Sequence, residues 1–217
     1  MSKTESYDEY KIIFYSTSIF SVVFIILTIL GILFYPASFA LWGNHLSDTG
    51  NTSVNGISNL TSEILFALAL DLLGISSIIF FTFSPRLFRG KAKMIAMIGS
   101  IFAIIAGFAC IAVSVLPSNI DPFWHGVMFA LVLGFTIPSF IFYTIAIFLR
   151  KKYPIEYGII FLLTAVIILI YAVILLAFWN TPLEMNSQKI MIYSLVFCMM
   201  IEGIGAGNFA KKYGRGK

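Results

Sequence analysis

Charged residues are scarce in this chain, and histidine and cysteine are scarcer still. Only 11% of the 217 residues are charged, and there are two histidines and two cysteines. Because Cys110 and Cys198 both fall in long apolar runs, we expect them to pack in the protein interior rather than to form a disulfide. The chain also lacks the HExxH, GxSxG, P-loop and dinucleotide-binding patterns, so no motif identifies a metal or another cofactor.

Apolar residues dominate the composition instead, at 59% of the chain with a mean hydropathy of +0.96. Long apolar runs without two-residue alternation predict membrane-spanning helices, whose backbone groups are satisfied within each helix. We therefore predict an all-α fold, a six-transmembrane-helix bundle that forms a single integral membrane domain over residues 1–217. The predicted spans are about 12–35, 62–83, 94–116, 123–149, 158–179 and 190–209.

The lysines and arginines are distributed unevenly between the two sides of this bundle. Thirteen of the fourteen fall in the N-terminal segment, in the connectors after the second and fourth spans, and in the tail, whereas Lys189 alone falls on the other side. Because basic residues accumulate on the cytoplasmic side, we predict cytoplasmic N- and C-termini in the plasma (cell) membrane. Topology also accounts for the net charge of +4, so we expect no nucleic-acid partner.

Small residues mark two helices for close packing. In the third span they recur every three or four residues, at Ala96, Ser100, Ala103, Gly107, Cys110 and Ser114. This stripe predicts that the third span is buried in the bundle. In the last span, Gly203 and Gly207 form a GxxxG pattern, which predicts packing within the bundle or a homo-oligomer through these two glycines.

One stretch between the first two spans, residues 42–60, is polar, and we call it the polar island. It contains His45, Ser47 and Asp48, and it should fold over the outer mouth of the bundle. We predict that Asp48 accepts a hydrogen bond from His125, which opens the fourth span. An acid inside a membrane is costly, so Asp71 of the second span should lie below this pair and face the bundle interior.

Three functions from different classes fit these residues. The first is binding of a lipid or another amphiphile in an outer-facing polar pocket, with membrane lipids as partners. The candidate ligand-binding residues are Ser47, Asp48, Glu63, Asp71, Asp121 and His125. The second is a membrane-embedded hydrolase or transferase acting on lipid headgroups, with His45, Asp48 and His125 as catalytic residues. The third is a structural or accessory subunit whose acids only hold the bundle together. Zinc binding by the histidines and carboxylates stays open.

The order of these features resembles the DRAM/Frag/Sfk group of membrane proteins and related prokaryotic six-span families of unknown function. The resemblance is carried by the Leu46–Gly50 element LSDTG, by Glu63–Phe66 at the start of the second span, and by Trp124-His125-Gly126. It implies a six-span protein associated with lipid handling, with Asp48 and His125 as hallmark polar residues.

Overall fold

The computed structural model describes residues 5–150 and 152–214, and it is helical apart from one hairpin and the connecting loops. Six of its helices are long and apolar enough to cross a membrane. They are α1 (Glu5–Leu33), α2 (Leu60–Phe83), α3 (Gly90–Ser114), α4 (Pro122–Leu149), α5 (Ile155–Ala177) and α6 (Pro182–Gly214). The predicted helical fold class with six long apolar helices is therefore confirmed. Four of the basic residues counted above, Lys3, Lys151, Arg215 and Lys217, lie outside the described residues.

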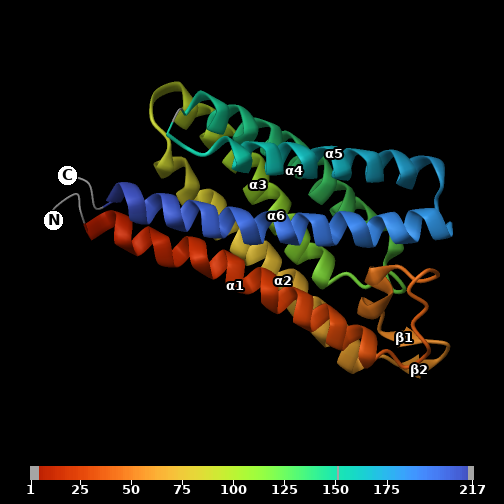
Figure 1. Ribbon diagram of the computed structural model, residues 1–217. Coiled ribbons are helices and arrows are strands. Elements are labelled where there is room, and N and C mark those ends of the chain that lie inside the picture. The colour runs from red at the N-terminus through yellow and green to blue at the C-terminus, as the bar shows by residue number, and fades with distance from the viewer. Residues whose placement is uncertain (1–4, 151, 215–217) are drawn as a thin grey trace.

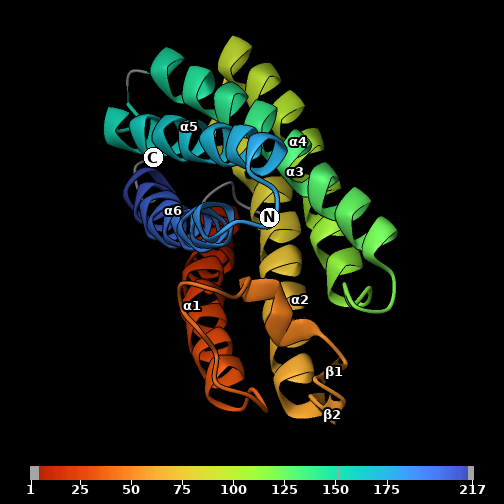
Figure 2. The same cartoon turned by 90° about the vertical axis from the view of Figure 1, so that its right-hand side faces the viewer.

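The six helices form a ring in chain order. Each packs against the helices before and after it, and α6 packs against α1 to close the ring, as the view in Figure 2 shows. The start of α1 and the end of α6 lie at one end of the bundle, which we call the terminal end (Figure 1). The polar island and the α5–α6 connection lie at the other end, the island end.

The small-residue stripe of α3 is buried, as predicted, except that Ser114 at its end is half-buried. Gly107 shows why the residues must be small, because a Cβ at this position would lie 2.7 Å from a side-chain carbon of Ile78 on α2 and 3.0 Å from the carbonyl oxygen of Gly74. Gly203 packs in the same way on α1, where a Cβ would lie 2.7 Å from the carbonyl oxygen of Phe14. Gly207 faces the ring of Tyr15, also on α1. The two glycines thus pack within this chain, and a homo-oligomer through them stays a prediction.

Two features at the island end differ from the sequence-based expectation. The polar island folds into a short 3₁₀ helix, η1 (Leu46–Gly50), followed by the strands β1 (Ser53–Val54) and β2 (Ile57–Ser58). Asn55 and Gly56 join these strands with φ values of 52° and 79°, as a two-residue hairpin turn requires. At the terminal end, a second short 3₁₀ helix, η2 (Ser84–Leu87), follows α2.

The last helix begins at Pro182, eight residues before the predicted start of the sixth span at Ile190. Thr181 lies just before it, and the backbone N–H of Glu184 donates to the Thr181 hydroxyl at 3.4 Å. A threonine followed three residues later by a glutamate, with proline at the first helical position, is a helix-start pattern. The segment around Glu184 and Lys189, predicted as a loop, is therefore helical.

Candidate functional site: a polar cluster at the island end

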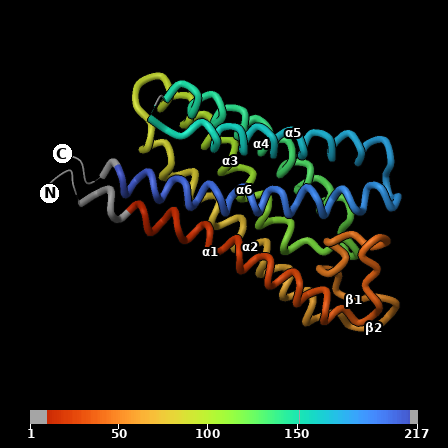
Figure 3. Tube along the Cα trace, in the orientation of Figure 1, coloured from red at the N-terminus to blue at the C-terminus, as the bar shows by residue number. Residues whose placement is uncertain are grey.

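The polar island packs against the ends of α1, α2 and α6, and Figure 3 shows it lying between α1 and α6. Leu46 and Thr49 of η1 are completely buried. The carbonyl oxygen of Thr49 accepts hydrogen bonds from Asn59 and from Ser62 at the start of α2, at 3.0 and 2.9 Å. These bonds fix η1 over the bundle, so the half-buried His45, Ser47 and Asp48 occupy defined positions.

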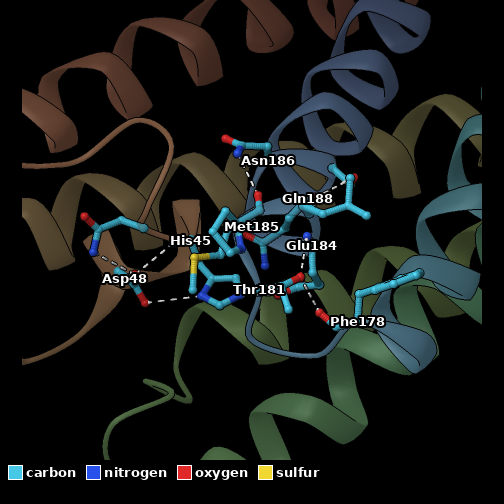
Figure 4. A network of polar contacts seen from close by, with 12 residues as sticks. His45, Asp48, Phe178, Thr181, Glu184, Met185, Asn186 and Gln188 are labelled. Atoms are coloured by element: carbon cyan, nitrogen blue, oxygen red, sulfur yellow. Dashed lines mark hydrogen bonds and ion pairs between the residues drawn. The ribbon is translucent and has the colours of Figure 1, made fainter.

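His45 forms the central contact of the site. Its Nε2 lies 2.6 Å from a carboxylate oxygen of Glu184, whose side chain is only 1% exposed (Figure 4). The other oxygen of Glu184 accepts a hydrogen bond from the Tyr171 hydroxyl of α5 at 3.0 Å. On the opposite side of the imidazole, Nδ1 is 4.0 Å from Asp48, which also accepts the His45 backbone N–H at 2.9 Å. Both ring nitrogens therefore face carboxylates.

Two further α6 residues complete what we call the island cluster: His45, Asp48, Tyr171, Glu184, Gln188 and Lys189. The side-chain oxygen of Gln188 accepts the backbone N–H of Leu46 at 3.0 Å. Lys189 is half-buried and donates to the carbonyl oxygen of Met185 at 3.1 Å. With Asp48 and Glu184 as acids and Lys189 as a base, the cluster joins side chains of both charge signs.

The cluster also affects a neighbour outside it. Burial is the main cause that raises the pKa of the Tyr35 phenol, and the negative charge of Asp48 raises it further.

The predicted hydrogen bond between Asp48 and His125 is wrong. Within the described residues no hydrogen bond or ion pair joins the two side chains. Instead, His125 Nδ1 is 2.7 Å from the carbonyl oxygen of Leu116, so its ring secures the loop between α3 and α4. Asp121 caps α4, because its carboxylate accepts the backbone N–H of Trp124 at 3.1 Å. Both residues thus have local structural partners at the start of α4.

Asp71 turns toward a neighbouring helix, as expected of an acid in an apolar segment. It is half-buried, and the Ser114 hydroxyl of α3 lies 2.6 Å from its carboxylate. Glu63 is half-buried in the first turn of α2. In the described part of the chain its carboxylate has no hydrogen-bond or ion-pair partner. Neither acid lines the cavity described next, and the outer-facing pocket that includes them stays a prediction.

The cavity lies at the centre of the ring, between α2, α3, α4 and α6. The space inside it that water-sized molecules can occupy is about 30 Å³. Its walls are mostly carbon and are formed by Leu73, Gly74, Ser77, Phe81, Ala103, Ala106, Gly107, Cys110, Val132, Thr136, Phe140, Leu195 and Met199. None of the island-cluster residues belongs to this wall, so the cavity is separate from the cluster.

A model of the Frag1/DRAM/Sfk1/Cwh43P N-terminal domain matches residues 45–201 of this chain. The chain belongs to this family. This confirms the resemblance, and six apolar helices agree with it. No curated protein and no solved structure matches the chain. The part that matches the Frag1/DRAM/Sfk1 domain begins at His45 and includes the whole island cluster.

Sequence reasoning found His45 and Asp48 of this Frag1/DRAM-family site and missed Glu184, Gln188 and Tyr171. The helix-start pattern at Thr181–Glu184 could have shown that Glu184 and Gln188 share one face of a helix. No local pattern points to Tyr171. In the described residues, no group of three or more histidine, cysteine, aspartate or glutamate side chains is placed to hold a metal ion.

Proposed function

We propose that this Frag1/DRAM-family protein binds a membrane lipid or another amphiphile at the island cluster, which contacts the polar headgroup. The observation that carries this proposal is the His45–Glu184 contact at 2.6 Å, which holds a mixed-charge surface at the end of an apolar bundle. Lys189 and Asp48 give this surface groups of both signs, which complement the phosphate and amine of a zwitterionic headgroup.

The surroundings of the cluster support a position at the membrane surface. Trp42 and Trp179 flank it in sequence and are 76% and 71% exposed. Tryptophan is enriched where the bilayer meets water. The 33 residues of α6 correspond to about 50 Å, which exceeds a hydrocarbon core of about 30 Å, so the first turn with Glu184 can lie at headgroup level.

The proposal includes an orientation, with the island end outside the cell and both termini in the cytoplasm of a plasma-membrane protein. Its support is the concentration of lysine and arginine in segments that Figure 1 shows at the terminal end, such as the connector with Arg86 and Arg89. The headgroup would then come from the outer leaflet.

A hydrolase or transferase using His45, Asp48 and His125 has less support. A general base needs a free ring nitrogen within reach of the proton that it removes. Nε2 of His45 is already in contact with Glu184. His125 contacts the carbonyl oxygen of Leu116 through Nδ1 alone, but within the described residues it forms no hydrogen bond or ion pair with His45 or Asp48, so the three residues do not form one catalytic group. A purely structural role for the island cluster is tested by the experiments below.

Lipid binding is tested with a phosphatidylcholine whose headgroup carries a photoreactive diazirine, added to the protein in phosphatidylcholine nanodiscs. We expect crosslinks in peptides that contain residues 42–48 and 184–189, and fewer of them after Lys189→Gln. The matched control is Lys91→Gln, which removes the same charge at the exposed start of α3. Crosslinks absent from both island-end peptides would contradict binding and leave the structural role.

Orientation is tested by labelling intact cells with an impermeant maleimide. Ser53 and Arg89 are both exposed, one at each end of the bundle, and the native Cys110 and Cys198 are buried. We expect Ser53→Cys to react and Arg89→Cys to react only after the cells are opened. The reverse pattern would contradict the orientation.

A further inference from the structure

The segment that joins α2 to α3 concentrates positive charge on the surface of the bundle. Four basic side chains lie within its residues 86–93, which we call the basic connector: Arg86, Arg89, Lys91 and Lys93. All four are exposed, and Figure 1 shows this segment at the terminal end. The sequence has no aspartate or glutamate between Asp71 and Asp121. Among the residues that the structure describes, none of the four cations forms an ion pair, so their charge is available to an anion from outside the chain.

Arg86 is held in place by its neighbours. Its guanidinium donates a hydrogen bond to the hydroxyl of Tyr10 on α1. It also lies over the rings of Tyr10 and Phe83, at 5.0 and 4.7 Å from their centroids. A guanidinium presents a planar fork of N–H donors that binds phosphate bidentately, and one contact with Tyr10 leaves most of this fork unused. Because the side chain is already ordered, an anion that binds it loses less affinity to ordering.

The basic connector lies at the depth of the lipid headgroups. Leu87 and Phe88 within it are buried, so they fix it to the bundle. Met94 and Met97, which follow it on α3, are exposed and form part of the surface that contacts hydrocarbon. The 25 residues of α3 correspond to about 37 Å, which exceeds a hydrocarbon core of about 30 Å, so its first turn reaches the headgroups. The anion available at this depth is the phosphate of a lipid.

The charge of the basic connector also distinguishes between lipids. A zwitterionic headgroup carries an ammonium near its phosphate, which the four cations repel, whereas phosphatidylglycerol carries the phosphate alone. We propose that the basic connector binds the phosphate of an anionic phospholipid, with Arg86 as its main contact. The exposed apolar surface of α3 beside the connector favours a lipid over an acidic protein segment, which would approach from water. This site lies at the opposite end from the island cluster and does not depend on headgroup binding there.

The test uses the full-length protein in phosphatidylcholine nanodiscs that also contain phosphatidylglycerol with a diazirine on its headgroup. Both leaflets then hold the same lipids, so the result does not depend on the orientation of the protein. We expect crosslinks in peptides that contain residues 84–93. Arg86→Gln should lower them about fivefold, the factor for one charge near an anionic membrane surface. Absence of these crosslinks, or no loss in the variant, overturns the site.

Two further variants separate a phosphate site from a general attraction between charges. Arg86→Lys keeps the charge but removes the planar fork, so part of the crosslinking should be lost. Lys211→Gln removes one charge from the exposed end of α6, at the same end of the bundle, and should leave the crosslinks unchanged. Full crosslinking in Arg86→Lys, or equal losses in Lys211→Gln and Arg86→Gln, overturns the site. Equal crosslinking of these peptides by a phosphatidylcholine probe overturns the preference for an anionic lipid.

A variant of Arg89 keeps the test decisive if the loss of Arg86 disturbs its packing with Tyr10 and Phe83. Within the described residues, the side chain of Arg89 takes part in no hydrogen bond, ion pair or ring contact, so Arg89→Gln removes a charge without breaking a contact. It should lower the crosslinks by up to about fivefold, and unchanged crosslinking overturns the proposal. The phosphatidylcholine headgroup probe should crosslink the island end equally in all these variants, so the two sites are tested independently.

Discussion

Glu184 and Glu202 lie on the same helix and are equally buried, each with 1% of its surface exposed. Glu184, at the island end, contacts His45 and accepts a hydrogen bond from Tyr171. Glu202, near the terminal end, has two carboxyl oxygens without a hydrogen-bond partner among the residues that the structure describes. The two acids therefore differ in partners and not in burial.

The difference in partners between Glu184 and Glu202 indicates how the bundle is stabilised around each of them. Burying a polar group without a hydrogen bond costs free energy, and within the described residues Glu202 has no partner that offsets this cost. Around it, close contacts such as that of Gly203 with α1 supply the packing. At the island end, the contact of His45 with the Glu184 carboxylate and the hydrogen bond from Leu46 to Gln188 connect the polar island to α6. The surroundings of Glu202 thus depend on the packing of small residues, and the island end depends on paired polar groups.

The sharpest test of this comparison is the same substitution at both acids. Glu184→Gln should lower the free energy of unfolding by about 2–3 kcal/mol, because it weakens two hydrogen bonds to a buried charged group. Glu202→Gln should change it by less than about 0.5 kcal/mol, because an amide of similar size replaces a side chain whose carboxyl oxygens have no hydrogen bond to lose. Equilibrium unfolding in detergent micelles measures both. Equal losses in the two variants would contradict the proposed difference.

A smaller loss of stability is expected from a substitution that disturbs the packing between α2 and α3. Gly107→Leu should destabilise the fold by about 1–3 kcal/mol, because the new side chain overlaps Ile78 and the backbone at Gly74. The matched control is Gly134→Leu, because a Cβ at Gly134 would meet no atom within 4 Å. Thermal unfolding in detergent compares the two. If Gly107→Leu melts like the control, the interface between α2 and α3 is looser than the structure shows.

The helices were predictable because each is a long continuous apolar run, and a membrane leaves few alternatives for such a run. The hairpin was predictable in principle, since Asn55-Gly56 between Val54 and Ile57 is a hairpin signal. The start of α6 likewise has a local signal in Thr181 and Glu184. These features depend on neighbours in the sequence, so a closer reading could have found them.

The partners within the site were not predictable in the same way. His45 and Glu184 are 139 residues apart and meet only because α6 closes the ring beside α1 and receives the polar island. The charge distribution predicts which end of the bundle a residue occupies, but it does not determine which helices are neighbours there. For this reason the charge distribution led us to predict a contact between Asp48 and His125 at one end, whereas in the structure each has local partners.

Asp71 offers the intermediate case between the two glutamates. It is half-buried, and Ser114 is its only hydrogen-bond partner among the described residues. Ser114→Ala removes that partner and should cost about 1 kcal/mol, the usual value of one such bond. The control is Ser187→Ala, because the hydroxyl of Ser187 donates only to Leu183 of its own helix. This substitution should lower the free energy of unfolding by less than about 0.5 kcal/mol. The loss in free energy of unfolding, measured in detergent, should then follow the number of hydrogen-bond partners of each acid. It should be largest for the contacts of Glu184, smaller for the contact of Asp71 and smallest for Glu202. A loss in Ser114→Ala as large as that in Glu184→Gln would show that partner number does not set the order.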